Sequence, residues 1–347
     1  MTRLLVVDDS SFVRKALRRA LATHPEIEIA GEAASGAEAL DLARRLDPDV
    51  VTLDVAMPGL DGLETLRRLL ERRPDLPVIM LSAHTRQGAA AALEALALGA
   101  VDFIDKTSLN LMDLDRLGRE LAERIEALGR GGGDQRVRRS RPRSPGRPAP
   151  ADLGRAELCV IGASTGGPAA LQHLLERLPA SFPLPIALVQ HMPVGFTRPF
   201  AERLDGLCRL EVREAREGDA LRPGRVLVAP AGRHLRISPR LTAVLSDEPR
   251  EARHVPSVDV LMLSAARARP GRVLGILLTG MGDDGAEGLR AIRAQGGITL
   301  AESEESCAVY GMPRAAVERG AVEHVLALEE IAEVLRAVSP ATPGAQR

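Results

Sequence analysis

Residues 158–167 have the sequence LCVIGASTGG, an apolar run that ends in a turn of small residues. The run shows no alternation of polar and apolar positions, which is typical of a parallel strand buried on both faces. Helical periodicity follows from about residue 167. The same order of apolar run, polar turn and helix begins at residues 4–9, LLVVDD. Two α/β domains are therefore predicted, each with a parallel sheet covered by helices.

The composition fits this class and excludes others. The 347 residues are 45% hydrophobic and 27% charged with a net charge of −1, which gives no general attraction to nucleic acid or anionic membranes. Five Phe, one Tyr and no Trp are too few for a base-stacking surface. The three cysteines lack zinc-ligand spacing, no apolar run approaches the roughly 18 residues of a membrane helix, and the first residues are unlike a signal peptide. We expect a cytoplasmic protein with no nucleic-acid partner and no membrane insertion.

A change in composition separates the two predicted domains. Residues 129–150 contain seven Arg, five Gly and four Pro but one large apolar residue, Val137, so they cannot bury enough surface to fold. A basic tether for an acidic partner is the alternative interpretation of this stretch. The prediction is an α/β domain over 1–128, a flexible linker over 129–156, a second α/β domain over 157–338 and a frayed tail over 339–347.

The strands predicted for the first domain are short and each precedes a helical pattern. They are 4–7, 27–30, 50–53, 78–81 and 101–104. This is a flavodoxin-like (βα)5 arrangement, in which functional groups gather at the carboxyl ends of the strands. In the second domain, 158–161, 186–189, 273–278 and 298–300 are predicted as buried parallel strands of a doubly wound sheet. Residues 210–244, with short strands at 226–229 and 234–237, are predicted as an antiparallel insertion at its edge.

Five polar side chains follow strand ends of the first domain: Asp8, Asp9, Asp54, Ser82 and Lys106. Three converging carboxylates repel one another unless a cation lies among them, and oxygen ligands of this kind suit Mg²⁺. A carboxylate that faces a metal, a hydroxyl and an ammonium group is arranged to accept a phosphoryl group. Helix capping explains any one of these Asp residues, but not the whole set.

These residues resemble the receiver domain of two-component systems over residues 1–128. The resemblance is carried by 8–9 (DD), 52–59 (TLDVAMPG), 61–62 (DG), 82–83 (SA) and 102–106 (DFIDK). It implies Asp54 as phosphoacceptor, Asp8, Asp9 and the Ala56 carbonyl as further Mg²⁺ ligands, and a histidine kinase of the chemotaxis type as phosphodonor. It also implies Ser82, Phe103 and Lys106 as the residues that respond to the phosphate. Thr107 departs from the family, which often has Pro after the lysine.

In the second domain, Ser164 lies on a strand-to-helix turn, where its hydroxyl is presented beside free N–H groups. A phosphate-binding loop is the competing interpretation, but no Lys follows and the G-x-G-x-x-G spacing is absent. A serine nucleophile needs a base, and the candidates are His191, which ends a strand, and His254. Residues 279–285, TGMGDDG, bring Asp283 and Asp284 to the same edge. The order Ser, His, Asp differs from that of α/β-hydrolases.

Residues 157–337 resemble the catalytic domain of the CheB family, the chemotaxis-specific protein-glutamate methylesterases. Besides the loops at 162–167 and 279–285, the match runs through 190–193 (QHMP), 195–197 (GFT), 200–204 (FAERL), 228–230 (VAP), 256–261 (PSVDVL) and 310–314 (YGMPR). The resemblance implies Ser164 as nucleophile, His191 as base and Asp284 as the orienting acid, with Met281 and Thr165 as oxyanion donors. Asp283 departs from the family, which has Asn there, and a second carboxylate could compete with Asp284.

The two resemblances together imply a phosphorylation-activated esterase. It would demethylate glutamate γ-methyl esters on methyl-accepting chemotaxis receptors and deamidate particular glutamines, with Mg²⁺ needed by the receiver and no cofactor needed by the esterase. The unphosphorylated receiver is expected to shield the Ser164 edge. Two other classes of protein are alternatives to an esterase. A nucleic-acid-binding output would need a basic recognition helix after residue 157, and a scaffold without catalysis would lack the Ser, His and Asp that this chain has.

Overall fold

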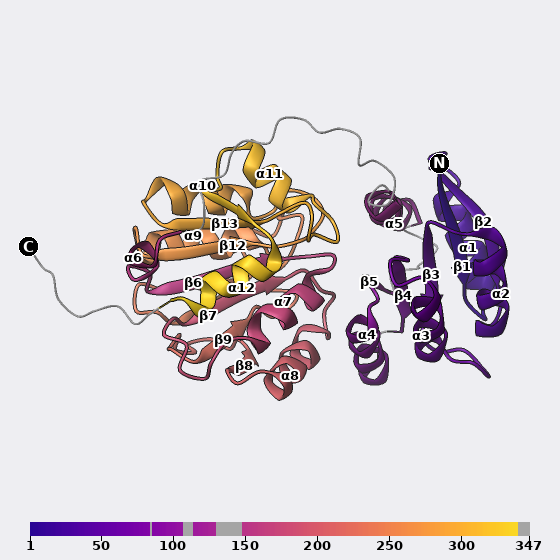
Figure 1. The fold of residues 1–347 in the computed structure, drawn as a ribbon, viewed down its shortest axis with the longest axis horizontal. Helices are drawn as coiled ribbons and strands as arrows, with labels where there is room; N and C mark the ends of the chain where they lie inside the picture. The colour runs from indigo at the N-terminus through magenta and orange to yellow at the C-terminus, as the bar shows by residue number, and fades with distance from the viewer. Residues whose placement is uncertain (84, 107–113, 130–147, 339–347) are drawn as a thin grey trace, which may run out of the picture. The chain divides into compact units, whose positions relative to one another are not determined.

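We describe a computed structural model of the chain over residues 1–83, 85–106, 114–129 and 148–338. Contacts within the chain divide it into two compact units, 1–140 and 141–347, and each is described by itself (Figure 1). Thr107, most of the predicted linker and the predicted tail lie outside the described residues.

The first unit alternates strands and helices throughout. Its elements are β1 (Thr2–Val7), α1 (Ser11–Leu21), β2 (Ile27–Ala33), α2 (Gly36–Leu46), β3 (Val50–Asp54), α3 (Gly62–Arg72), β4 (Val78–Ser82), α4 (Arg86–Leu98), β5 (Asp102–Asp105) and α5 (Leu114–Gly129). The strands form one parallel sheet in the order β2-β1-β3-β4-β5, with α1 and α5 packed together on one face and α2, α3 and α4 on the other. The predicted flavodoxin-like arrangement is confirmed.

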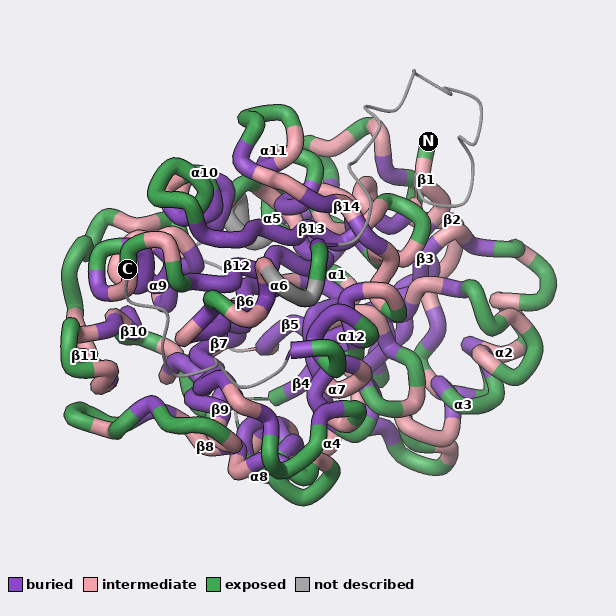
Figure 2. Tube along the Cα trace, turned by 60° about the vertical axis from the view of Figure 1, so that its left-hand side comes forward, coloured by how far each residue is buried: buried purple, intermediate pink, exposed green. Residues whose placement is uncertain are grey.

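Local sequence explains where these elements begin. Ser35, Asp61 and Thr85 precede α2, α3 and α4, and each side-chain oxygen accepts a hydrogen bond from a backbone N–H of the first turn. The central strands β3 and β4 are buried along their whole length, as the purple segments of Figure 2 show, which accounts for their uninterrupted apolar sequence. At Gly62, a Cβ atom would lie 2.0 Å from the Asp54 carbonyl oxygen, so only glycine allows the loop to return to the end of β3.

The second unit is larger. Its elements are α6 (Pro150–Leu153), β6 (Leu158–Ala163), α7 (Gly167–Glu176), β7 (Ile186–Gln190), α8 (Thr197–Leu207), β8 (Glu211–Glu214), β9 (Arg225–Val228), β10 (His234–Ile237), β11 (Ala243–Ser246), α9 (Val258–Ala268), β12 (Val273–Leu277), α10 (Ala286–Ala294), β13 (Ile298–Glu302), α11 (Met312–Glu318), β14 (His324–Leu326) and α12 (Leu328–Arg336).

Seven of these strands form a parallel sheet in the order β14-β13-β12-β6-β7-β9-β8. Helices α7, α8 and α12 lie on one face, and α9, α10 and α11 on the other. The first strand of the unit, β6, is central: the chain goes to β7 on one side and to β12 on the other. The strand order reverses at β6, and the carboxyl ends of the strands at such a point form the usual binding crevice of α/β sheets.

The prediction for residues 226–229 was wrong. They were assigned to an antiparallel insertion, but β9 pairs in parallel with both β7 and β8 and extends the main sheet. The prediction for residues 234–237 is confirmed, because β10 pairs antiparallel with β11. A four-residue strand between turns carries too little pattern to reveal its partners, and burial of Val226, Leu227 and Val228 under the helices decides the pairing.

Part of the predicted linker is ordered. Residues 150–153 form α6, and Leu153 and Ala156 are buried. The N–H of Glu157 then donates to the Arg272 carbonyl at 2.8 Å, directly before β6 begins. The described part of the chain contains no helix that is long and apolar enough to span a membrane.

Candidate active site and acidic pocket

Asp8, Asp9 and Asp54 meet at the carboxyl edge of the first sheet. Asp8 and Asp9 follow β1, Asp54 ends the neighbouring strand β3, and one oxygen from each lies within 4.8 Å of the others. Asp8 and Asp54 are buried, whereas Asp9 is exposed. Neighbouring parallel strands therefore bring together the three carboxylates that the sequence placed at strand ends.

Lys106 closes this acidic pocket from the end of β5. Its Nζ lies 2.7 Å from Asp8 Oδ2 and 2.7 Å from Asp54 Oδ2. Burial raises the pKa of the Asp54 carboxyl, while the hydrogen bond and charge of Lys106 act in the opposite direction. One ammonium group thus faces two buried carboxylates, which leaves the pocket with an excess of negative charge.

The donor set fits a hard divalent cation. Carboxylate oxygens are the ligands that Mg²⁺ prefers, and the exposed side of Asp9 leaves room for water in the coordination shell. Asp8 Oδ2 is buried, and the Lys106 ammonium at 2.7 Å offsets only part of the negative charge of the three carboxylates. Ala56 lies two residues after Asp54, and its N–H donates to Asp54 Oδ1 at 3.2 Å.

Ser82 and Phe103 lie on the neighbouring strands β4 and β5. The Ser82 hydroxyl is buried and donates to the Gly88 carbonyl at 2.8 Å, so it is joined to the first turn of α4. Phe103 is 4% exposed and its ring is therefore packed inside the unit. The Ser82 strand, β4, is next to the strand that ends in Asp54. The Phe103 strand, β5, is one strand further along the sheet.

Ser164 begins the turn after the central strand β6 of the second unit. Its N–H donates to the Thr279 carbonyl at 3.0 Å, and its own carbonyl accepts from the Gly167 N–H at 2.7 Å. A Cβ atom at Gly280 would lie 2.7 Å from the Ser164 Cβ, so this position excludes any side chain. The turn that carries the hydroxyl is thus held between the start of α7 and the loop after β12.

His191 and Asp284 are hydrogen-bonded to each other beside that turn. His191 directly follows β7, the strand next to β6, and its N–H donates to the Ala163 carbonyl at 3.1 Å. The two atoms His191 Nε2 and Asp284 Oδ2 are 2.8 Å apart, and the two side chains are 9% and 10% exposed. His191 Nδ1 is buried and has no hydrogen-bond partner among the described residues.

The start of α9 holds Asp284 in its ionised form. Ser257 Oγ donates to Asp284 Oδ1 at 2.8 Å, and the N–H groups of Val258 and Asp259 donate to its two oxygens at 2.7 and 3.0 Å. Burial acts to raise the pKa of Asp284, but His191 and these backbone donors outweigh it and lower the pKa to about 2. The Ser257 hydroxyl was not singled out from the sequence, where it reads as the helix cap that it also is.

Asp283 does not compete with Asp284. It is exposed, and its carboxylate pairs with Arg319 after α11. Asp259, whose N–H donates to Asp284, has its own Oδ1 bonded to the Gly288 N–H at 2.7 Å. Burial, together with the charge of Asp284, raises the pKa of Asp259 to about 6.

The loop after β12 also presents a free donor. The Met281 N–H makes no hydrogen bond to any group that the structure describes, and neighbouring Gly280 is fixed on both sides by backbone bonds to Val309 and Gly311. Thr165, the second predicted oxyanion donor, directly follows Ser164 and is buried.

Gln190 is a further residue that the sequence did not single out. Its buried Nε2 donates to the carbonyl of Ser164 at 2.9 Å and to that of His191 at 3.1 Å. One amide therefore joins the backbones of the two residues that the prediction assigns as nucleophile and base.

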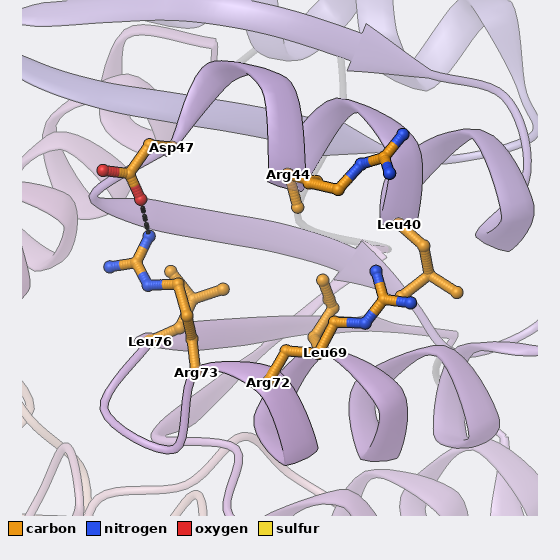
Figure 3. Close-up of a pocket in the computed structure, with 8 residues that line it drawn as sticks. Leu40, Arg44, Asp47, Leu69, Arg72, Arg73 and Leu76 are labelled. Atoms are coloured by element: carbon orange, nitrogen blue, oxygen red, sulfur yellow. Dashed lines mark hydrogen bonds and ion pairs between the residues drawn. The ribbon is translucent and has the colours of Figure 1, made fainter.

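A separate hollow of about 600 Å³ lies in the first unit between the ends of α2 and α3 (Figure 3). Leu40, Leu69 and Leu76 line its apolar side, and Arg73 pairs with Asp47 at 2.6 Å on its rim. The carboxyl ends of these helices lie at the amino edge of a parallel sheet, opposite the acidic pocket. The hollow therefore contains none of the groups considered so far.

Comparisons with known proteins agree with this geometry. A family model described as CheB methylesterase matches residues 159–335, and one described as response regulator receiver domain matches residues 4–116. Proteins named protein-glutamate methylesterase/protein-glutamine glutaminase from Carboxydothermus hydrogenoformans and Alkalilimnicola ehrlichii are 46% and 41% identical, each over 96% of this chain and 98% of the relative. The crystal structure of the Thermotoga maritima CheB methylesterase catalytic domain is 37% identical, with a TM-score of 0.52, and covers 53% of this chain and 99% of its own.

A receiver domain joined to a parallel-sheet esterase domain defines a class of protein, the response regulators with an enzymatic output. Within that class, the chain belongs to the CheB methylesterase family.

Proposed function

We propose that this chain hydrolyses glutamate γ-methyl esters on chemoreceptors and releases methanol, and that it deamidates particular receptor glutamines by the same chemistry. The single observation that carries the proposal is the largely buried His191–Asp284 pair at the carboxyl edge of the sheet, where the two residues follow β7 and β12, the strands on either side of the Ser164 strand. Family membership adds the substrate class, because the relatives are named for both activities.

The proton positions of the pair define the base. Asp284 is ionised with its pKa near 2, so the proton between the two side chains belongs to His191 Nε2. The lone pair of the neutral ring is then on Nδ1, the nitrogen without a partner among the described residues. We assign Nδ1 as the atom that takes the Ser164 hydroxyl proton.

The reaction proceeds through an acyl-serine. Ser164 Oγ attacks the γ-carbonyl carbon while His191 Nδ1 takes its proton, and Asp284 stabilises the imidazolium. The same proton then passes to the methoxide, or to the amide nitrogen of glutamine, as the carbon–oxygen or carbon–nitrogen bond breaks. Water repeats the attack on the acyl-serine, which releases glutamate and restores Ser164.

The Met281 N–H is the oxyanion donor best supported by the structure. It has no other acceptor among the described residues, and the backbone bonds of Gly280 hold it without a rearrangement. Thr165 is assigned as the second donor from its position after the nucleophile.

Control by phosphorylation belongs to the same proposal. Asp54 accepts the phosphoryl group from a chemotaxis histidine kinase, and Mg²⁺ is held by Asp8, Asp9, Asp54 and the Ala56 carbonyl. When bound, Mg²⁺ would supply positive charge that offsets the charge of the phosphoryl group. Lys106 is already within 2.7 Å of Asp54 and adds a second cation. Ser82 and Phe103 change their positions when Asp54 is phosphorylated, which alters the surface of the unit. The proposed substrate is the cytoplasmic helices of the receptors, so the proposal includes a cytoplasmic location.

A methanol-release assay on membranes that contain methylated receptors tests the proposal. We expect methanol from methylated membranes and none from membranes whose receptors were never methylated. His191→Asn should remove this release by several orders of magnitude, because the substitution removes the proposed base. If the wild-type protein, phosphorylated or not, releases no methanol from any methylated receptor, the substrate assignment is wrong.

A further inference from the structure

The imidazole of His254 stacks on the imidazole of His191. The two ring centroids are 4.1 Å apart and the ring planes differ by 13°. His254 lies between β11 and α9, in the segment that also ends in Ser257, the hydroxyl donor to Asp284. The same segment therefore contacts both members of the His191–Asp284 pair.

This segment is tied down at both ends by one buried residue. His234 on β10 is fully buried, its Nδ1 accepts the Ser257 N–H at 3.1 Å, and its Nε2 lies 3.1 Å from the Pro249 carbonyl. Because Nδ1 accepts, Nε2 carries the proton and the ring is neutral. The Gly232 N–H adds a bond to the Val255 carbonyl at 3.1 Å, next to His254. The stacked His254 therefore belongs to a loop that hydrogen bonds hold in place.

The stack restrains the orientation of the His191 ring, which the single contact with Asp284 does not fix. Asp284 holds the His191 ring at Nε2 alone, since Nδ1 has no partner among the described residues. A ring fixed at one nitrogen can still tilt about that contact, and the tilt would change the direction of Nδ1. A flat ring at 4.1 Å blocks the tilt on one face.

We propose that His254 is a positioning residue, which keeps His191 Nδ1 directed at Ser164 through ring stacking. The inference rests on the proposed esterase function for its kinetic readout, but not for its spectroscopic one. Because stacking requires a flat ring and no proton, Phe should replace His254 and Leu, which is of similar size but not flat, should not.

The experiment compares His254→Phe with His254→Leu in the full chain, with His191→Asn as the reference for a lost base. In the methanol assay we expect kcat within threefold of wild type for Phe and about 10- to 100-fold lower for Leu, with KM unchanged in both. Thermal melting of each variant confirms that it is folded. Equal activity of Phe and Leu variants overturns the proposal. A loss as large as that of His191→Asn in both would make His254 a participant in proton transfer, which also overturns it.

A second measurement needs no substrate and separates failure of the inference from failure of the proposed function. In histidine-selective ¹⁵N-labelled protein, the His191 Nε2–H signal reports how firmly the ring is held. We expect a narrow signal in wild type and in His254→Phe, and a signal broadened or lost by exchange in His254→Leu. An unchanged signal in the Leu variant contradicts the positioning role, whether or not methanol is released.

Discussion

Two residues of the site have roles that follow from their hydrogen bonds alone. Asp284 accepts three hydrogen bonds from the start of α9 besides facing His191, which fixes its charge and its direction. Gln190 contributes no reacting atom, yet its Nε2 joins the carbonyls of Ser164 and His191. The spacing of the proposed nucleophile and base therefore depends on a neutral amide that is 2% exposed.

Gln190→Met tests this role. The substitution keeps the volume but removes two hydrogen bonds, which leaves the His191 carbonyl without this donor and the Ser164 carbonyl with the Gly167 N–H, at a cost of about 1–3 kcal/mol of stability. We expect a lower melting temperature and a kcat about tenfold lower, because the two catalytic backbones are no longer joined. Gln172→Met is the matched control, since the Gln172 amide bonds only to Glu176 within α7. If the two variants behave alike, Gln190 has no positioning role.

At the scale of elements, the order of β7, β6 and β12 decides the site. The carboxyl ends of adjacent parallel strands meet, so the sequence could place Ser164, His191 and Asp284 at one edge from strand ends alone. It could not place Ser257 or His254 there, because both depend on how a loop 23 residues from His234 in sequence packs on β10. Nor could it show that Asp283 turns toward Arg319, a contact across 36 residues. Pairing of the short strand β9 was mispredicted for the same reason: its partners are distant in sequence.

Asp259, which joins the start of α9 to α10, should make the stability of the chain depend on pH. The pKa of Asp259 is raised to about 6, so the folded chain holds this proton more tightly than the unfolded chain. The contribution of Asp259 to stability is greatest below about pH 4 and declines as the pH rises toward 6. Asp259→Asn removes this decline while keeping an oxygen for the Gly288 N–H.

We therefore expect Asp259→Asn to be more stable than wild type at pH 7–8, by on the order of 1 kcal/mol, with no gain at pH 4. Urea denaturation at the two pH values measures the difference. Asp259→Ala, which lacks the acceptor, serves as the control and should show no net gain. A gain for Asn that is the same at both pH values would mean that charge on Asp259 is not the cause.

For the whole molecule, the prediction concerns coupling between its two units. Phosphate adds about −1.5 to −2 charges at Asp54, which Mg²⁺ and Lys106 offset in one conformation of the receiver unit better than in another. A tenfold rise in esterase rate corresponds to a bias of only about 1.4 kcal/mol. Asp54→Asn should keep the full chain at its basal rate when acetyl phosphate and Mg²⁺ are added, whereas the wild type rises.

A fragment that begins at residue 148 is the reference for this coupling, because it keeps α6 with the esterase unit. We expect the fragment to be faster than the unphosphorylated full chain and indifferent to acetyl phosphate. A fragment slower than the full chain would show that the receiver unit assists the esterase instead of restraining it.

Ser164 is proposed to form the acyl-enzyme, and methanol release by Ser164→Ala from methylated receptors, measured with the chain phosphorylated, tests this role. Loss of the nucleophile should lower the rate by about 10⁴- to 10⁶-fold. The melting temperature should stay near that of wild type, since the substitution removes one hydroxyl from a turn held by backbone bonds. Methanol release within tenfold of the wild-type rate would mean that Ser164 is not the nucleophile.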